Sequence, residues 1–220
     1  MPTRSPAPTA PTPSRRRRAT RERLVEATLE LLARTGIAAA SVEHICETAG
    51  FTRGAFYSNF ADKDDLLAAV IDHQVERLAG TLTASARVAP GDDPVPLDAV
   101  LDVVLGVPGF GDDFYLRYTE LCLHVARSRS PRLVAAFARL DEQIAGALGD
   151  LLAGLGLAPV VPVPHLLCVL QGVLAESHRR ALLGGDEDRN RIARTLIPPV
   201  LAGLTRPRTS EGAAPAPAAT

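Results

Sequence analysis

Several residue types and patterns are missing from this sequence. It contains no tryptophan, one methionine and a single lysine, Lys63. No apolar run approaches the roughly eighteen residues that a membrane-spanning helix requires. The first residues are rich in proline, threonine and arginine, where a secretory signal would be apolar. We therefore expect a soluble, cytoplasmic protein with no membrane partner.

Cysteine is also scarce. Cys46, Cys122 and Cys168 are far apart and odd in number, and no C-x-x-C pair occurs, which argues against a disulfide framework. We expect Cys122 and Cys168 to be buried small hydrophobic residues, with a redox-sensing role as the alternative.

No pattern typical of an enzyme is present. Glycine-rich phosphate loops of Walker or Rossmann spacing are absent. Ser177 and His178 are adjacent, so on a helix their side chains point about 100° apart and cannot form a nucleophile–base pair. We expect no catalytic residues.

Two pairs of side chains could bind a metal ion. Glu120 and His124, and likewise His165 and Cys168, would share a helical face. Such pairs arise often by chance, and neither has a third ligand close in sequence. We expect no metal site and no cofactor.

Basic and acidic residues are separated along the chain. Residues 1–63 contain ten Arg and Lys against six Asp and Glu, although the whole chain has a formal net charge of -1. Residues 1–19 combine frequent proline with a four-arginine run, and residues 206–220 end in APAPAAT. Both compositions predict disordered tails.

Between these tails the apolar residues recur with helical spacing, and the two-residue alternation typical of strands is absent. The sequence therefore predicts an all-α protein. The first helix is expected at 20–34, ended by Gly36. Three more helices are expected to begin after Ser41, Thr52 and Asp62, whose side chains can cap them.

Further helices are predicted in the second half of the chain. Pro198 and Pro199 should end or kink the last of them. Helix 112–129 is apolar on most of its circumference, which predicts a place in the middle of a helical layer. The expected ranges are 97–107, 112–129, 131–153, 164–183 and 186–205.

The stretch GFTRGAFYSNFADKDDL, residues 50–66, follows a short helix and a glycine turn. Two short helices separated by such a turn predict a helix-turn-helix, whose second helix enters the major groove of DNA. Phe56 and Phe60 are four residues apart and can face the core of this unit. Small and polar side chains then remain on or beside the outward face: Thr52, Arg53, Ala55, Tyr57, Ser58 and Asn59.

Two residues of this stretch support the same interpretation. Gly54 inside a helix costs about 1 kcal/mol relative to alanine, and a close backbone approach to DNA would explain it. Lys63 lies near the start of the next helix, where its ammonium group and the helix N-terminus together favour a phosphate.

The segment SVEHICETAGFTRGAFYSNFADKDDLL resembles the DNA-binding segment of the tetracycline-repressor (TetR) family of bacterial transcriptional regulators. The resemblance covers roughly residues 20–70 and includes the A-G turn, G-x-x-Y-x-x-F and K-x-x-L. It implies a helix-turn-helix domain at 20–66 and a ligand-binding and dimerisation domain at 67–205. It also implies a homodimer built largely on the last two long helices, a palindromic operator and a small-molecule pocket.

By the same resemblance, some of these side chains contact DNA. Ser41, Tyr57 and Lys63 would hold phosphates, and the groove-facing set would be Thr52, Arg53, Gly54, Ala55, Tyr57, Ser58 and Asn59. Alternatives remain: Ser41 and Thr52 could be only helix caps, and Tyr57 could be a half-buried core aromatic. The arginine run could be a solvated tail or a minor-groove arm.

The C-terminal domain gathers most of the remaining aromatic residues, which predicts an apolar ligand pocket with a few polar groups. Ordinary core packing is the alternative. The candidate pocket residues are Phe110, Phe114, Tyr115, Tyr118, Cys122, His124, Phe137 and Gln171.

The last two helices carry more apolar surface than one subunit can obviously cover, which predicts dimerisation. The candidate interface residues are Leu166, Leu170, Val173, Leu174, Ile192 and Leu196. We expect a dimeric repressor that binds double-stranded operator DNA and is released by an apolar or aromatic effector. The alternative is a helical small-molecule binding protein without DNA function.

Overall fold

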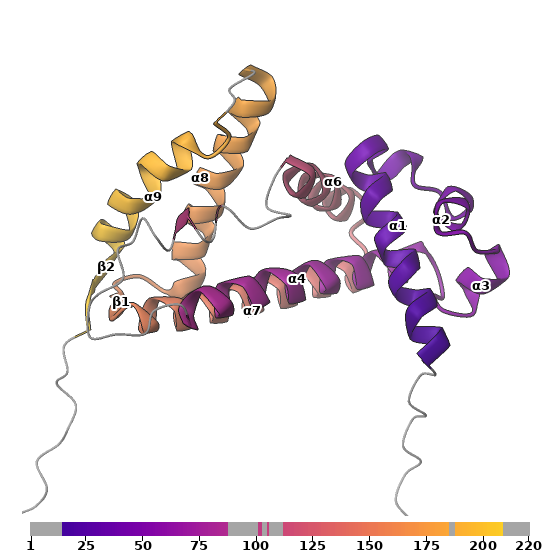
Figure 1. Ribbon diagram of the computed structural model, residues 1–220, viewed down its shortest axis with the longest axis horizontal. Coiled ribbons are helices and arrows are strands. Elements are labelled where there is room, and N and C mark those ends of the chain that lie inside the picture. The colour runs from indigo at the N-terminus through magenta and orange to yellow at the C-terminus, as the bar shows by residue number, and fades with distance from the viewer. Residues whose placement is uncertain (1–14, 88–100, 103–104, 106–111, 185–187, 209–220) are drawn as a thin grey trace, which may run out of the picture.

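The computed structural model describes residues 15–87, 101–102, 105, 112–184 and 188–208 (Figure 1). Helices make up nearly all the regular structure of these residues, which confirms the all-α prediction. The predicted arm up to residue 14, most of the helix predicted at 97–107, Phe110 and the tail from residue 209 lie outside the described residues.

Four helices form the N-terminal part: α1 (Arg15–Ala39), α2 (Val42–Ala49), α3 (Arg53–Tyr57) and α4 (Lys63–Arg87). The three predicted caps are confirmed. The Ser41 hydroxyl accepts a hydrogen bond from the His44 amide and Thr52 accepts one from the Ala55 amide, both at 3.2 Å. The Asp62 carboxylate accepts one from the Asp65 amide at 2.7 Å. Each cap satisfies an amide that would otherwise lack a partner at a helix start.

Helix α1 starts earlier than predicted, while Gly36 breaks it as predicted. It begins at Arg15, so the prediction of disorder up to residue 19 is wrong for its last five residues, because arginine and alanine are good helix formers. At the other end, Gly36 interrupts the helix with φ 73° and ψ 173°, and a short helical segment then reaches Ala39. Glycine alone adopts this backbone conformation readily.

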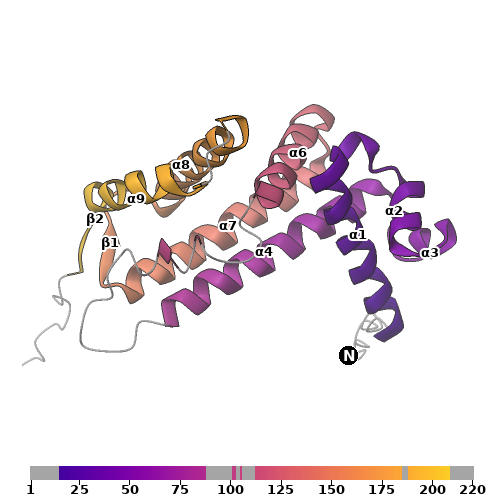
Figure 2. The same ribbon diagram turned by 45° about the horizontal axis from the view of Figure 1, so that its top comes forward.

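The C-terminal part contains α6 (Asp112–Ser128), α7 (Pro131–Gly154), α8 (Val163–Gly184) and α9 (Arg191–Leu204). Helices α4 and α7 lie side by side along the molecule, with α1–α3 at one end and α8–α9 toward the other (Figures 1 and 2). Helix α9 continues through Pro198 and Pro199 to Leu204, so of the two predicted effects, an end or a kink, these prolines do not end the helix.

A short strand pair was not predicted. Strand β1 (Leu157–Pro159) pairs antiparallel with β2 (Thr205–Pro207), with Ala158 opposite Arg206. Each strand is too short to show a two-residue alternation. The start of the tail predicted to be disordered from residue 206 is therefore paired.

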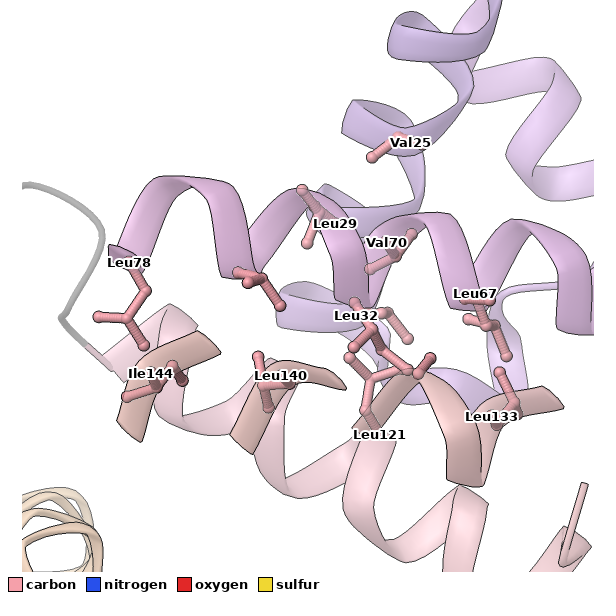
Figure 3. Close-up of a cluster of buried hydrophobic side chains, with 14 of the residues drawn as sticks. Val25, Leu29, Leu32, Leu67, Val70, Leu78, Leu121, Leu133, Leu140 and Ile144 are labelled. Atoms are coloured by element: carbon pink, nitrogen blue, oxygen red, sulfur yellow. The ribbon is translucent and has the colours of Figure 1, made fainter. Parts of the chain in front are cut away.

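One hydrophobic core runs through the described helices. In Figure 3, Leu32 of α1, Leu67 and Val70 of α4 and Leu133 of α7 meet around Leu121 of α6. Because α4 contributes to both ends of this core, it ties the N-terminal helices directly to the C-terminal ones.

Helix α6 is less buried than predicted. Leu121 is buried, but 37% of Leu116 and 47% of Leu123 is exposed. The helix packs mainly on α1 and α8 and adds Leu121 to the core, while its other side faces solvent. Helix α6 therefore carries apolar residues around most of its circumference, although one side of it faces solvent.

Candidate nucleic-acid interface and ligand cavity

Phe56 and Phe60 set the orientation of α3. Both are fully buried, as predicted, with ring centroids 5.8 Å apart. The Arg21 guanidinium lies 4.2 Å from the centre of the Phe60 ring and donates a hydrogen bond to the carbonyl of Asn59 at 3.0 Å. These contacts hold the end of α3 against α1, so the opposite face of α3 points outward.

The outward face carries most of the predicted side chains. Tyr57 is 51% exposed, with its ring edge against Phe56, so its ring is half-buried against the core while about half of the side chain faces solvent. Ala55 is partly buried. The exposed members of the predicted set are Ser41, Thr52, Arg53, Gly54, Tyr57 and Ser58.

Asn59 does not belong to this face. It is 9% exposed, and its side-chain amide donates to the Ala55 carbonyl at 2.8 Å and to the Ser58 hydroxyl at 3.2 Å. The expectation of a groove-facing Asn59 is wrong, because α3 ends at Tyr57 and the chain turns inward toward Phe60.

Ser41 and Thr52 are helix caps, but capping leaves part of each hydroxyl available. A hydroxyl has one O–H donor and two acceptor lone pairs, and the cap bond uses only an acceptor. Because both side chains are exposed, each O–H can still donate to a phosphate. The two interpretations of these residues are therefore compatible.

Arg53 is held by two neighbours on this surface. Its guanidinium lies 2.7 Å from the Glu43 carboxylate and is hydrogen-bonded to Tyr57. The hydrogen bond with Tyr57 and the charge of Glu43 both raise the pKa of Arg53. A phosphate or base that binds Arg53 must therefore compete with Glu43.

Lys63 also has a structural partner. Its ammonium group donates to the Ile37 carbonyl at 3.0 Å, beyond the break in α1. The group is half-buried, and this burial lowers its pKa, while Asp64 opposes the shift. Lys63 therefore joins the end of α1 to the start of α4, and an ammonium group with three donors keeps capacity for a phosphate.

A cavity of about 190 Å³ lies among α4, α6, α7 and α8. Five of the predicted pocket residues line it: Phe114, Tyr115, Tyr118, Phe137 and Gln171. Cys122 and His124 do not, so both predictions are wrong. Cys122 is hydrogen-bonded to Tyr118, and burial raises the pKa of its thiol. His124 faces α4, with its Nε2 3.9 Å from the Asp64 carboxylate.

Two polar lining residues, Gln74 and His178, were missed as pocket residues. His178 stacks on Tyr115, with ring centroids 5.7 Å apart and planes 11° apart, and its Nδ1 lies 2.9 Å from the Leu174 carbonyl. Gln171 and His178 are seven residues apart and therefore lie on one helical face. This spacing could have predicted that His178 lines the cavity beside Gln171. Gln74 is buried on α4, where it lines the cavity.

The predicted dimer residues divide into three groups. Leu166 and Leu170 are buried within the chain, so their placement at a dimer interface is wrong. Leu174 lines the cavity. Val173 and Ile192 are partly buried, and Leu196 is 44% exposed. Exposed apolar residues that were missed include Val169 (43%) and Leu183 (77%).

The other residues considered as catalytic, redox or metal-binding candidates show no arrangement typical of such a site. The Ser177 hydroxyl donates to the Arg189 carbonyl at 2.7 Å and accepts from the Ala193 amide, which joins α8 to α9. Cys168 is exposed, contrary to the expectation of burial. Among the described residues, no three or more His, Cys, Asp or Glu side chains form a metal-ligand group.

None of the described helices combines the length and apolar character needed to cross a bilayer.

The fold and the exposed α3 define a helical protein with a helix-turn-helix at its N-terminal end. Residues 24–70 match the family described as bacterial regulatory proteins, tetR family. The N-terminal part of the chain is therefore similar to this family.

The chain is also similar in sequence to individual transcriptional regulators. The chain is 34% identical over 83 residues to the HTH-type transcriptional regulator BetI of Ectopseudomonas mendocina, which covers 37% of this chain and 42% of BetI. It is 29% identical over 143 residues to the HTH-type transcriptional regulator TcmR of Streptomyces glaucescens, or 63% of this chain and 61% of TcmR. The alignments thus span about two fifths to three fifths of these relatives.

The fold is also similar to solved structures. A transcriptional regulator from Rhodococcus sp. Rha1 superimposes with a TM-score of 0.65 at 21% sequence identity, covering 84% of this chain and 97% of that one. The overall arrangement of helices is thus shared even where the sequences have diverged.

Proposed function

We propose that this protein is a DNA-binding transcriptional repressor, which acts as a homodimer on a palindromic operator and is released by a small molecule. The observation that carries the proposal is the surface of α3. Phe56 and Phe60 are buried while Thr52, Arg53 and Tyr57 are exposed, and hydroxyl and guanidinium groups of this kind contact phosphates and base edges.

The DNA contacts follow from exposure and chemistry. Ser41, Thr52 and Tyr57 offer hydroxyl donors to phosphates, and Lys63 offers an ammonium group beside them. Arg53 lies next to Gly54, whose missing side chain leaves the helix surface open. Ala55 and Ser58 complete the groove-facing set. In a dimer the two α3 helices would occupy successive major grooves about 34 Å apart.

Release by a ligand is supported by the position of α6. Tyr118 and Leu121 of this helix line the cavity, while Glu120 between them contacts α1. A ligand that favours a shifted α6 would therefore favour a different placement of the N-terminal helices, and the population would move away from the DNA-bound arrangement.

The dimer is proposed through the outer side of α8 and α9. Val173 and Ile192 are partly exposed there, and Val169 and Leu196 present apolar surface to solvent. A surface with several large apolar side chains on adjacent helices is typical of a subunit interface.

Selection from a random double-stranded DNA pool with the full chain tests the DNA proposal. We expect enrichment of an inverted repeat, whereas a small-molecule binding protein without DNA function would enrich none. Affinity for the selected site should fall steeply as salt rises, because phosphate contacts release counterions. A flat salt response would contradict the proposed contacts.

A matched pair of variants then tests the interface. Tyr57→Phe removes one exposed hydroxyl and should weaken binding roughly fivefold, the effect of one hydrogen bond of about 1 kcal/mol. Tyr115→Phe removes a hydroxyl near the cavity and should leave DNA affinity unchanged. Equal affinity of all three proteins for the selected site would refute the assignment of Tyr57.

A further inference from the structure

The cavity among α4, α6, α7 and α8 has an uncharged wall. Its described lining is mostly Leu, Ile and aromatic side chains, and its polar members are Gln74, Tyr115, Tyr118, Gln171 and His178. No Asp, Glu, Lys or Arg is among these described lining residues.

Most of the polar groups already have partners inside the protein. Tyr118 is hydrogen-bonded to Cys122, and Gln171 is hydrogen-bonded to Asp141. His178 lies 2.9 Å from the Leu174 carbonyl through its Nδ1. The wall itself therefore offers an ionic ligand no direct opposite charge, since Asp141 lies behind Gln171 and is engaged by it, and burying an unpaired ion in such surroundings is strongly unfavourable.

The size and walls of the cavity favour a compact ring system. A dry apolar cavity of about 150 Å³ can hold benzene, and this one has about 190 Å³. Phe114 stacks on Tyr118 with ring centroids 6.1 Å apart, and Phe137 meets Tyr118 edge-on at 6.0 Å. Aromatic walls of this kind pack well against a flat ligand.

We propose that this cavity binds an uncharged, largely apolar ring compound and rejects cations and carboxylates of the same shape. The proposal rests on the proposed function for the role of the cavity as an effector site, but the charge preference follows from the wall itself. Gln74, together with the hydrogen-bonding capacity that the Gln171 amide keeps beyond its bond to Asp141, would recognise one neutral polar substituent.

Three probes with the same ring system test the preference. Isothermal titration calorimetry of the full chain at pH 7.5 would compare 2-naphthol, 2-naphthoate and a trimethyl-(2-naphthyl)ammonium salt. We expect 2-naphthol to bind at least roughly tenfold more tightly than either ion, because only the ions lose charge solvation. Equal or tighter binding of an ion, or no binding of 2-naphthol up to its solubility, would overturn the proposal.

A charged side chain placed in the cavity wall should change the order of affinity of the three probes. Gln74→Glu puts a carboxylate at a buried lining position with little change in shape, and we expect the cation to gain roughly tenfold relative to 2-naphthol. Gln143→Glu adds the same charge at an exposed position on α7 and should leave the ranking unchanged. If Gln74→Glu does not fold, Leu174→Glu at a partly exposed lining position of α8 serves the same purpose. An unchanged ranking in a folded wall variant would place the binding site elsewhere.

The outcome is separable from the proposed function, because the titrations contain no DNA. If the random DNA pool yields no enriched site while 2-naphthol is preferred, the repressor proposal fails and the charge preference stands. If the operator is found and the ions bind as tightly as 2-naphthol, only the charge preference fails.

Discussion

The Glu120 carboxylate of α6 accepts a hydrogen bond from the backbone amide of Ile37 at 3.0 Å, across 83 residues of sequence. The Ile37 carbonyl in turn accepts from Lys63 at 3.0 Å. The segment after the break in α1 is therefore held on one side by α6 and on the other by the first residue of α4. Two neighbours of Glu120 on α6, Tyr118 and Leu121, line the cavity.

Removing this contact should both destabilise the protein and weaken the link between its two ends. We expect Glu120→Ala to lower the free energy of unfolding by about 1 to 2 kcal/mol, as for a hydrogen bond to a charged group. DNA release should then need a higher concentration of 2-naphthol. Denaturant titration and fluorescence anisotropy with labelled operator measure the two effects.

Glu142→Ala is the control for this variant, because Glu142 is an exposed glutamate on α7. It should change neither quantity. If Glu120→Ala releases DNA at the same ligand concentration as the unmodified protein, then α6 does not act through Ile37.

Gly36 should not tolerate a side chain. Its φ of 73° with ψ of 173° is a conformation that residues other than glycine rarely adopt, and a Cβ there would lie 3.2 Å from the Glu120 carboxylate. We expect Gly36→Ala to lower the free energy of unfolding by about 1 to 3 kcal/mol, measured by denaturant titration. Gly80→Ala on α4 meets no atom within 4 Å and should instead stabilise by about 0.5 to 1 kcal/mol. Similar effects of both changes would argue against strain at Gly36.

Glu43 should oppose DNA binding, because it holds Arg53 and adds a negative charge beside the phosphates. We expect Glu43→Gln to tighten operator binding about twofold to fivefold at low salt, with a smaller gain at high salt. Glu30→Gln removes the same charge from the exposed Glu30–Arg34 pair on α1 and serves as the control in the anisotropy titration. Weaker binding by Glu43→Gln would mean that the Glu43 contact orients Arg53 for DNA.

The outer side of α8 and α9 should control assembly. A glutamate buried without a partner is strongly unfavourable, so Val169→Glu or Leu196→Glu should weaken dimerisation roughly 100-fold. Val134→Glu changes an apolar residue on α7 that is 51% exposed, and should leave the dimer intact. Sedimentation velocity distinguishes the species. A monomeric unmodified protein at micromolar concentration would contradict the proposed interface.

Local chemistry explains what could be predicted from the sequence. Ser41, Thr52 and Asp62 cap their helices through bonds that span three residues, and the spacing of Phe56 and Phe60 depends only on neighbouring turns. These features need no knowledge of distant parts of the chain, and all of them were found as expected.

The wrong predictions concern residues beyond the end of a helix, or residues whose burial depends on contacts with distant parts of the chain. Asn59 was placed by continuing a helical face beyond Tyr57, where α3 has already ended. Leu166 and Leu170 form an apolar face, but periodicity does not reveal whether such a face meets the same chain or a partner. The contact of Glu120 with Ile37 leaves no local pattern at all.

The pairing of β1 with β2 brings the two ends of the α8–α9 hairpin together. Besides the strand register, the Val160 amide donates to the Leu204 carbonyl at 2.9 Å and the Arg208 amide donates to the Gly156 carbonyl at 2.7 Å. The strand pair thus ties the start of α8 to the end of α9. Leu170 and Leu174 of α8 and Ile197 and Leu201 of α9 all line the cavity, so a ligand held there would contact both of the helices that carry the proposed dimer surface.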